Sequence, residues 1–119
     1  MNWYIAKMIF RIICGNGNHT AQFDEQLRLI TADNKEEAIR KSQQMGMRED
    51  EIFVNQHQQL VHWQYVTTSE LIKLNELVDG AELYSRIVEN ENADSYLHIV
   101  HKKAEHICNG NTHEMLNLV

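Results

Sequence analysis

The sequence predicts an α+β domain, a mainly antiparallel β-sheet with two (possibly three) helices packed on one face. The first indication is the segment from Trp3 to Cys14, which is apolar on both sides of an extended chain. The second is the order of patterns along the chain, in which strand-like segments come in neighbouring pairs and helix-like segments separate them. Neighbouring strands joined by short turns favour antiparallel pairing.

The first strand, from Trp3 to Cys14, belongs at the centre of the sheet. One of its rows is wholly apolar or small, and the other is apolar except for Lys7 and Arg11. These rows are Tyr4, Ala6, Met8, Phe10, Ile12 and Cys14 on one side and Trp3, Ile5, Ile9 and Ile13 on the other. A strand with one solvated face alternates apolar and polar residues, so this strand requires cover on both faces.

A turn at residues 15–18 and a second strand over residues 22–32 complete a predicted hairpin. The turn sequence Gly-Asn-Gly-Asn supplies residues that accept positive φ. We expect a register in which Ile9 lies opposite Leu27 and Arg11 lies opposite Glu25. In that register Arg11 and Glu25 would form a cross-strand ion pair on a largely apolar face.

A helix is expected to follow, with Asp33 as its cap, Glu36 three residues later and an end at Gly46. Its apolar stripe is narrow, which is typical of a helix lying on a sheet with most of its surface in water.

The second half of the chain predicts a further hairpin, an ambiguous segment, a strand and a long helix. The hairpin comprises residues 52–55 and 60–66, and a strand is expected over residues 81–89. Residues 68–79 fit a helix that ends before Gly80 slightly better than a strand. Residues 92–108 have the clearest helical period, with Ala93, Leu97, Val100, Ala104 and Ile107 on one face.

Length and composition predict one domain over residues 1–110 and a C-terminal tail over residues 111–119. The net charge is −6 and the 11 basic residues are scattered, which argues against nucleic acid or an anionic membrane as a partner. No apolar run approaches the ~20 residues of a membrane-spanning helix, and the N-terminus does not resemble a secretory signal. We therefore expect a cytoplasmic protein with reduced cysteines.

Two Cys-x4-His spacings are the candidate metal ligands of the chain: Cys14 with His19 and Cys108 with His113. Two thiolates and two imidazoles can form a tetrahedral structural zinc site. The spacing lacks the tight Cys-x2-Cys pair of common zinc folds, and turns and helix ends also require Asn and Gly. We expect no metal and no cofactor, and zinc stays as an alternative.

Catalytic signals are absent from the sequence, which contains neither a Gly-x-Ser-x-Gly turn nor a phosphate-binding glycine loop leading into a helix. If the protein is an enzyme or binds a small ligand, the candidate pockets lie near His62–Tyr65 or the acidic stretch Glu89–Asp94.

Several short patterns, in order along the chain, resemble a family of small bacterial proteins catalogued as a domain of unknown function. These patterns are Trp-Tyr-Ile-Ala-Lys at 3–7, Phe-Asp-Glu-Gln-Leu-Arg-Leu-Ile at 23–30, Glu-Glu-Ala at 36–38 and Asp-Gly-Ala-Glu-Leu-Tyr-Ser-Arg at 79–86. The resemblance implies a compact single-domain bacterial protein and supplies no activity, cofactor or catalytic residue.

The function that the sequence favours is non-enzymatic protein binding or homo-oligomerisation. Two helices on one sheet face leave the second apolar row of the first strand without cover, and such faces mark partner surfaces. We expect a homodimer, or a complex with another small protein, through the face that carries Trp3, Ile5, Ile9, Phe23 and Leu27.

Overall fold

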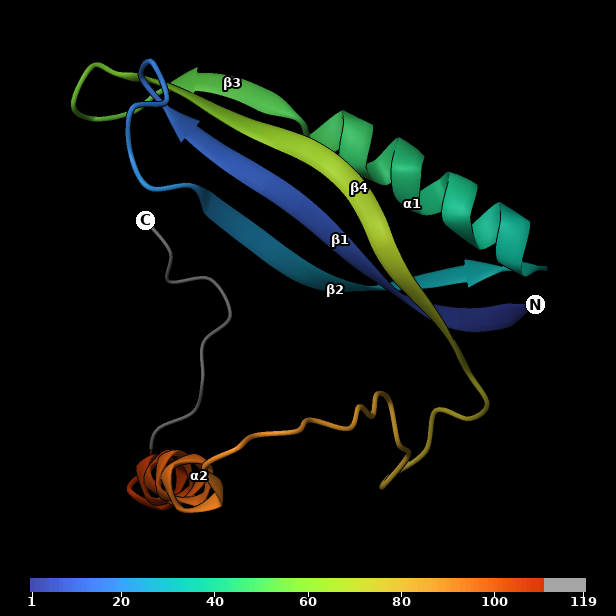
Figure 1. Ribbon diagram of the computed structural model, residues 1–119. Coiled ribbons are helices and arrows are strands. Elements are labelled where there is room, and N and C mark those ends of the chain that lie inside the picture. Colours follow the sequence, from blue (N-terminus) through green and yellow to red (C-terminus); the bar gives the residue numbers. More distant parts are fainter. Residues whose placement is uncertain (111–119) are drawn as a thin grey trace. The chain divides into compact units, whose positions relative to one another are not determined.

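A computed structural model describes residues 1–110, and the expected tail over residues 111–119 therefore lies outside the described residues. The chain divides into two compact units, the first spanning Met1–Ser85 and the second beginning at Arg86 (Figure 1). The expectation of one domain over residues 1–110 stays a prediction.

The first unit is built on a four-stranded antiparallel sheet, which confirms the predicted α+β fold class. Its strands are β1 (Asn2–Cys14), β2 (Gln22–Ala32), β3 (Glu51–Val54) and β4 (Leu60–Leu74). They lie in the order β2-β1-β4-β3, and every neighbouring pair is antiparallel. The long strand β1 is therefore central, as its two apolar rows predict.

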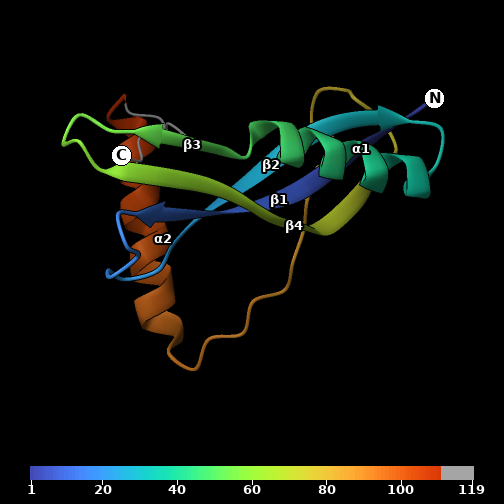
Figure 2. The ribbon, with the colours of Figure 1, turned by 90° about the horizontal axis from the view of Figure 1, so that it is seen from above.

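Helix α1 (Lys35–Glu49) covers one face of this sheet, which we call the helix-covered face (Figure 2). The wholly apolar row of β1 points to it. The buried core cluster consists of Tyr4, Ala6, Met8, Phe10, Ile30, Ala32 and Ala38. Met45, Trp63, Tyr65 and Leu71 pack around that cluster, and the Phe10 and Tyr65 rings meet edge to face with centroids 5.6 Å apart.

The register of the β1–β2 hairpin differs from the expected one. Ile9 lies opposite Glu25 rather than Leu27, and Arg11 lies opposite Phe23 rather than Glu25. The connecting loop is closed by a side chain, because the backbone N–H of Cys14 donates to His19 Nε2 at 3.0 Å. Loop geometry sets hairpin register, and this contact is not readable from strand periodicity. The predicted assignment of residues to faces is still correct, because the observed partner in β2 differs from the expected one by two residues and so lies on the same face.

Helix α1 begins and ends differently from the prediction. Its cap is Asn34, whose side chain accepts a hydrogen bond from the backbone N–H of Glu37, rather than Asp33. The helix continues past Gly46 to Glu49. Gly46 is needed for contact and not for termination, since a Cβ at this position would lie 2.3 Å from the Tyr65 ring.

A stripe of small buried residues lets α1 approach the sheet closely. Ala38, Ser42 and Gly46 are the buried residues of the helix, and their spacing of four places them on one face. The Ser42 hydroxyl donates to the Ile39 carbonyl at 2.7 Å and lies 2.8 Å from Thr68 Oγ1. Thr68 in turn lies 2.7 Å from the Tyr65 hydroxyl, so the polar groups buried under the helix satisfy one another.

The expected hairpin of residues 52–55 and 60–66 is confirmed, but the helix over residues 68–79 and the strand over residues 81–89 are wrong. Residues 68–74 continue β4 alongside β1, and residues 81–89 have no regular structure. Register irregularities in β4 fall at Val66 and Ser69, which have no opposite partner in β1. Each bulge shifts the side-chain alternation by one residue. The sequence of β4 therefore lacks the continuous alternation of apolar and polar residues that predicts a long strand.

The second unit contains α2 (Ala93–Cys108), which confirms the helix predicted over residues 92–108. Asn92 caps it by accepting a hydrogen bond from the backbone N–H of Ser95 at 3.0 Å. None of its residues is buried. The packing of a second helix on the sheet stays a prediction.

Replacing Gly46 with alanine tests the close helix–sheet contact. We expect Gly46→Ala to lower the free energy of unfolding by about 1–2 kcal/mol, since overpacking costs ~1–3 kcal/mol and outweighs the gain of up to ~1 kcal/mol in helix propensity. Urea unfolding measures the change. Gln43→Ala, at an exposed position of the same helix, is the control and should leave stability unchanged or slightly higher. Equal stability of both variants would contradict the contact.

Candidate functional site

The sheet face opposite α1, which we call the open face, presents large apolar side chains to solvent. It carries the row of β1 that starts at Trp3 and the β2 residues opposite that row. The exposed fractions are 38% for Trp3, 53% for Phe23, 46% for Leu27 and 50% for Leu29. These four residues, which we call the β2 patch, lie on the edge strand β2 and on the neighbouring end of β1.

The polarity of β2 is inverted with respect to the helix. Its side chains on the helix-covered face include Asp24, Gln26 and Arg28, whereas its open-face side chains include Phe23, Leu27 and Leu29. A strand of a sheet with a single covered face normally turns its apolar row to the cover and its polar row to water. Ile30 and Ala32, at the end of β2, do join the core under α1. Over residues 22–29, however, the apolar residues of β2 face away from α1, so this part of the strand matches a sheet that is covered on the open face as well.

The five residues predicted from sequence for an interface share this face but differ in accessibility. Trp3, Phe23 and Leu27 are exposed, Ile9 is half-buried and Ile5 is buried at 7%. Ile5 is therefore already covered within this chain. Sequence reasoning missed Leu29, although the alternation of β2 places it on the same face as Leu27.

The two cations of β1 on the open face, Lys7 and Arg11, have partners within the chain, Lys7 in ion pairs and Arg11 in a ring contact. Lys7 Nζ lies 2.9 Å from Glu25 Oε1 and 3.6 Å from Glu70 Oε2. The hydrogen bond to Glu25 raises the pKa of Lys7 above its ordinary value, with Coulombic support from Glu25, Glu70 and Tyr84 against the lowering effect of desolvation. Arg11, predicted to pair with Glu25, instead lies over the Phe23 ring at 5.8 Å from its centroid.

Three of the four candidate zinc ligands lie within the described residues. His19 uses both ring nitrogens in its own loop, because Nε2 accepts from the Cys14 backbone N–H and Nδ1 donates to the Thr20 carbonyl at 2.8 Å. Cys14 is half-buried, Cys108 is exposed in the second unit, and His113 lies outside the described residues. Residues 1–110 contain no group of three or more His, Cys, Asp or Glu side chains placed to hold a metal ion.

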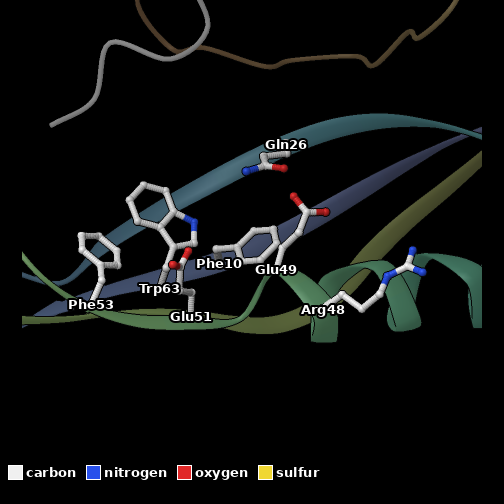
Figure 3. A pocket seen from close by; sticks show the side chains of 7 residues that line it. All are labelled: Phe10, Gln26, Arg48, Glu49, Glu51, Phe53 and Trp63. Atoms are coloured by element: carbon white, nitrogen blue, oxygen red, sulfur yellow. The ribbon is translucent and has the colours of Figure 1, made fainter.

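On the helix-covered face, a pocket of about 370 Å³ opens where α1 ends and the β3–β4 hairpin extends past it (Figure 3). It is lined by Phe10, Gln26, Arg48, Glu49, Glu51, Phe53 and Trp63. Of the segment His62–Tyr65, near which the sequence predicts a pocket, Trp63 lines this pocket. The other predicted pocket segment, Glu89–Asp94, consists of exposed residues of the second unit.

His62, the neighbour of Trp63, points to the other face and pairs with Asp50. Its Nε2 donates to Asp50 Oδ1 at 2.8 Å, and the backbone N–H of Tyr65 donates to Oδ2 at 2.9 Å. These hydrogen bonds, that of His62 first, hold the pKa of Asp50 below its ordinary value of 3.8. Asp50 directly follows α1, so its two hydrogen bonds fix the end of the helix to β4. This structural role accounts for the His62–Asp50 pair.

The His62–Asp50 pair predicts an acid-sensitive contribution to stability. A carboxylate with a lowered folded pKa stabilises the fold above its unfolded pKa, and this stability is lost as the pH falls through the folded value. We expect Asp50→Asn to cost about 1 kcal/mol or less at pH 6, as for other partly exposed ion pairs. The cost should shrink below pH 3.8. Urea unfolding at several pH values measures it, and a cost independent of pH would contradict the assignment.

The His19 contacts predict a loop role rather than a metal role. We expect His19→Ala to lower the free energy of unfolding by about 1 kcal/mol, because it removes two exposed hydrogen bonds. Addition of EDTA should leave the melting temperature of the wild type and of the variant unchanged. A melting temperature that EDTA lowers in the wild type but not in the variant would restore the zinc hypothesis.

Comparison with known proteins gives one match. The model of a family described as a domain of unknown function (DUF4288) matches residues 3–85. No curated protein and no solved structure matches the chain. Within residues 1–110, neither helix has the length and apolar character that crossing a membrane requires.

Proposed function

The chain belongs to the DUF4288 family of domains of unknown function, and from its geometry we propose that it is a non-enzymatic assembly module of the cytoplasm. It forms a homodimer through the open face of its sheet. The β2 patch is the centre of the contact, with Ile9 at its edge. The experiment that tests this proposal is a measurement of mass in solution.

The observation that carries the proposal is the inverted polarity of β2. Over residues 22–29 of β2, Phe23, Leu27 and Leu29 are exposed on the open face, while the residues between them on the other face are polar. Exposed large apolar side chains gathered on one face are typical of a protein interaction site. Burial of apolar area contributes roughly 25 cal/mol per Å², so covering these side chains supplies a driving force for association.

The pairing of charges favours a second copy as the occupant of the open face. Lys7 is neutralised by Glu25 and Glu70 in the same chain, and Arg11 rests on Phe23. The face therefore does not require a partner of opposite charge. A two-fold contact brings the same patch of each copy together, and such a contact works when the patch is apolar and its charges are already satisfied.

Charge introduction into the β2 patch tests the dimer. We expect light scattering of the wild type to give twice the chain mass of 14.0 kDa, and Leu27→Glu to weaken dimerisation at least ~10-fold. Lys7, which lies opposite Leu27, is already paired with Glu25 and Glu70, so a third carboxylate would add an uncompensated charge to the buried contact. Met47→Glu is the matched control, since Met47 is an exposed apolar residue of α1 and should leave the mass unchanged.

Two results would contradict the proposal. A wild type that stays monomeric at all concentrations would remove the homodimer, and a heterologous partner would then be the remaining occupant. A Leu27→Glu variant that is folded by circular dichroism and dimerises like the wild type would place the interface elsewhere.

A further inference from the structure

The pocket at the end of α1 has the size and the lining of a small-ligand site. Its volume of about 370 Å³ lies within the ~300–1,000 Å³ of typical ligand pockets. Aromatic rings from three different strands line it: Phe53 from β3 and Trp63 from β4, which are accessible, and Phe10 from β1, which is 1% exposed. Within residues 1–110, no hydrogen bond engages the indole N–H of Trp63.

Carboxylates outnumber guanidinium groups around these rings. Glu49 and Glu51 line the pocket directly. Arg28 forms a bidentate ion pair with Glu49, with Nη1–Oε1 and Nη2–Oε2 distances of 3.0 Å each. The carboxylate of Glu49 reaches toward Gln26, while the guanidinium of Arg48 points away from the rings along α1 (Figure 3).

A buried carboxylate behind the pocket wall adds to this negative charge. Asp24 is 6% exposed, and within residues 1–110 its side chain is held by the neutral amide of Gln26, which donates to Oδ2 at 2.6 Å. The same amide accepts from Arg28 Nη1 at 2.9 Å. Burial of a carboxylate is costly unless a positive charge compensates it. Arg28 therefore pairs directly with Glu49 and reaches Asp24 only through the amide of Gln26.

We propose that this pocket binds a small organic cation, an alkylammonium or guanidinium compound. The face of an aromatic ring is negative and attracts cations, Trp most strongly. Glu51, which forms no ion pair within residues 1–110, supplies the charge-assisted contact. Aromatic faces beside an unpaired carboxylate suit a cation better than an anion, which the carboxylates repel, or a neutral apolar compound, which leaves them unpaired. This inference is independent of the proposed dimer, since the pocket lies on the helix-covered face.

The test follows the two tryptophan indole signals in ¹H–¹⁵N spectra during titration of the wild type. The chain has two tryptophans, and a Trp3→Phe variant assigns the signal of Trp63. The probes are n-butylguanidinium and n-butylammonium, with n-butanol and butyrate as neutral and anionic controls of the same length. We expect saturable shifts of the Trp63 signal with the cations at millimolar Kd, and no saturable shift with the controls.

Matched carboxamide variants then identify the charge that binds. We expect Glu51→Gln to weaken binding of the cations at least ~5-fold. Glu76→Gln, at an exposed position after β4, should leave the affinity unchanged. Both variants keep the shape of the side chain and alter exposed positions, and their spectra report directly whether they are folded.

Three outcomes would overturn the proposal. Equal shifts with n-butanol would make the pocket a general apolar hollow. No saturable shift of the Trp63 signal with either cation would remove the site. Unchanged affinity in a folded Glu51→Gln variant would remove Glu51 as the recognition group and, with it, the electrostatic basis of the selectivity.

Discussion

The structure of the first unit depends on the pairing of β1 with β2 on one side and β4 on the other. Because β1 lies between β2 and β4, its backbone N–H and C=O groups form hydrogen bonds on both sides. Its two rows of side chains then point to opposite faces of the sheet, and each row requires its own cover. Helix α1 covers the row that includes Met8 and Phe10. The row that starts at Trp3 receives no helix within the first unit, and this asymmetry creates the open face.

The way in which α1 covers the sheet explains the pocket. Small residues at Ala38, Ser42 and Gly46 bring the helix close to β4, where the Tyr65 ring fills the space that a Cβ of Gly46 would need. The helix ends at Glu49, but the β3–β4 hairpin extends past it. The rings of Trp63 and Phe53 are therefore left without helix cover, beside the carboxylates of Glu49 at the end of α1 and Glu51 at the start of β3.

The two sheet faces thus carry different chemistry along the same strand. On β2 the row of Asp24, Gln26 and Arg28 forms a hydrogen-bonded ladder toward α1, whereas Phe23, Leu27 and Leu29 form an apolar surface away from it. The polar row serves the proposed cation pocket and the apolar row serves the proposed dimer. Since strand side chains alternate, substitutions on one row leave the other row in place.

The sequence by itself determined the fold class, the central place of β1, the β2 and α2 elements and the assignment of residues to sheet faces, because these follow from local periodicity and turn residues. It did not determine the hairpin register, which depends on the loop that the His19 contact closes, or the length of β4, whose bulges at Val66 and Ser69 interrupt its alternation. It also did not reveal that Gly46 serves a ring contact rather than a helix end. Tertiary structure decided these points, since each depends on an atom distant in sequence or on a pairing partner that no local pattern contains.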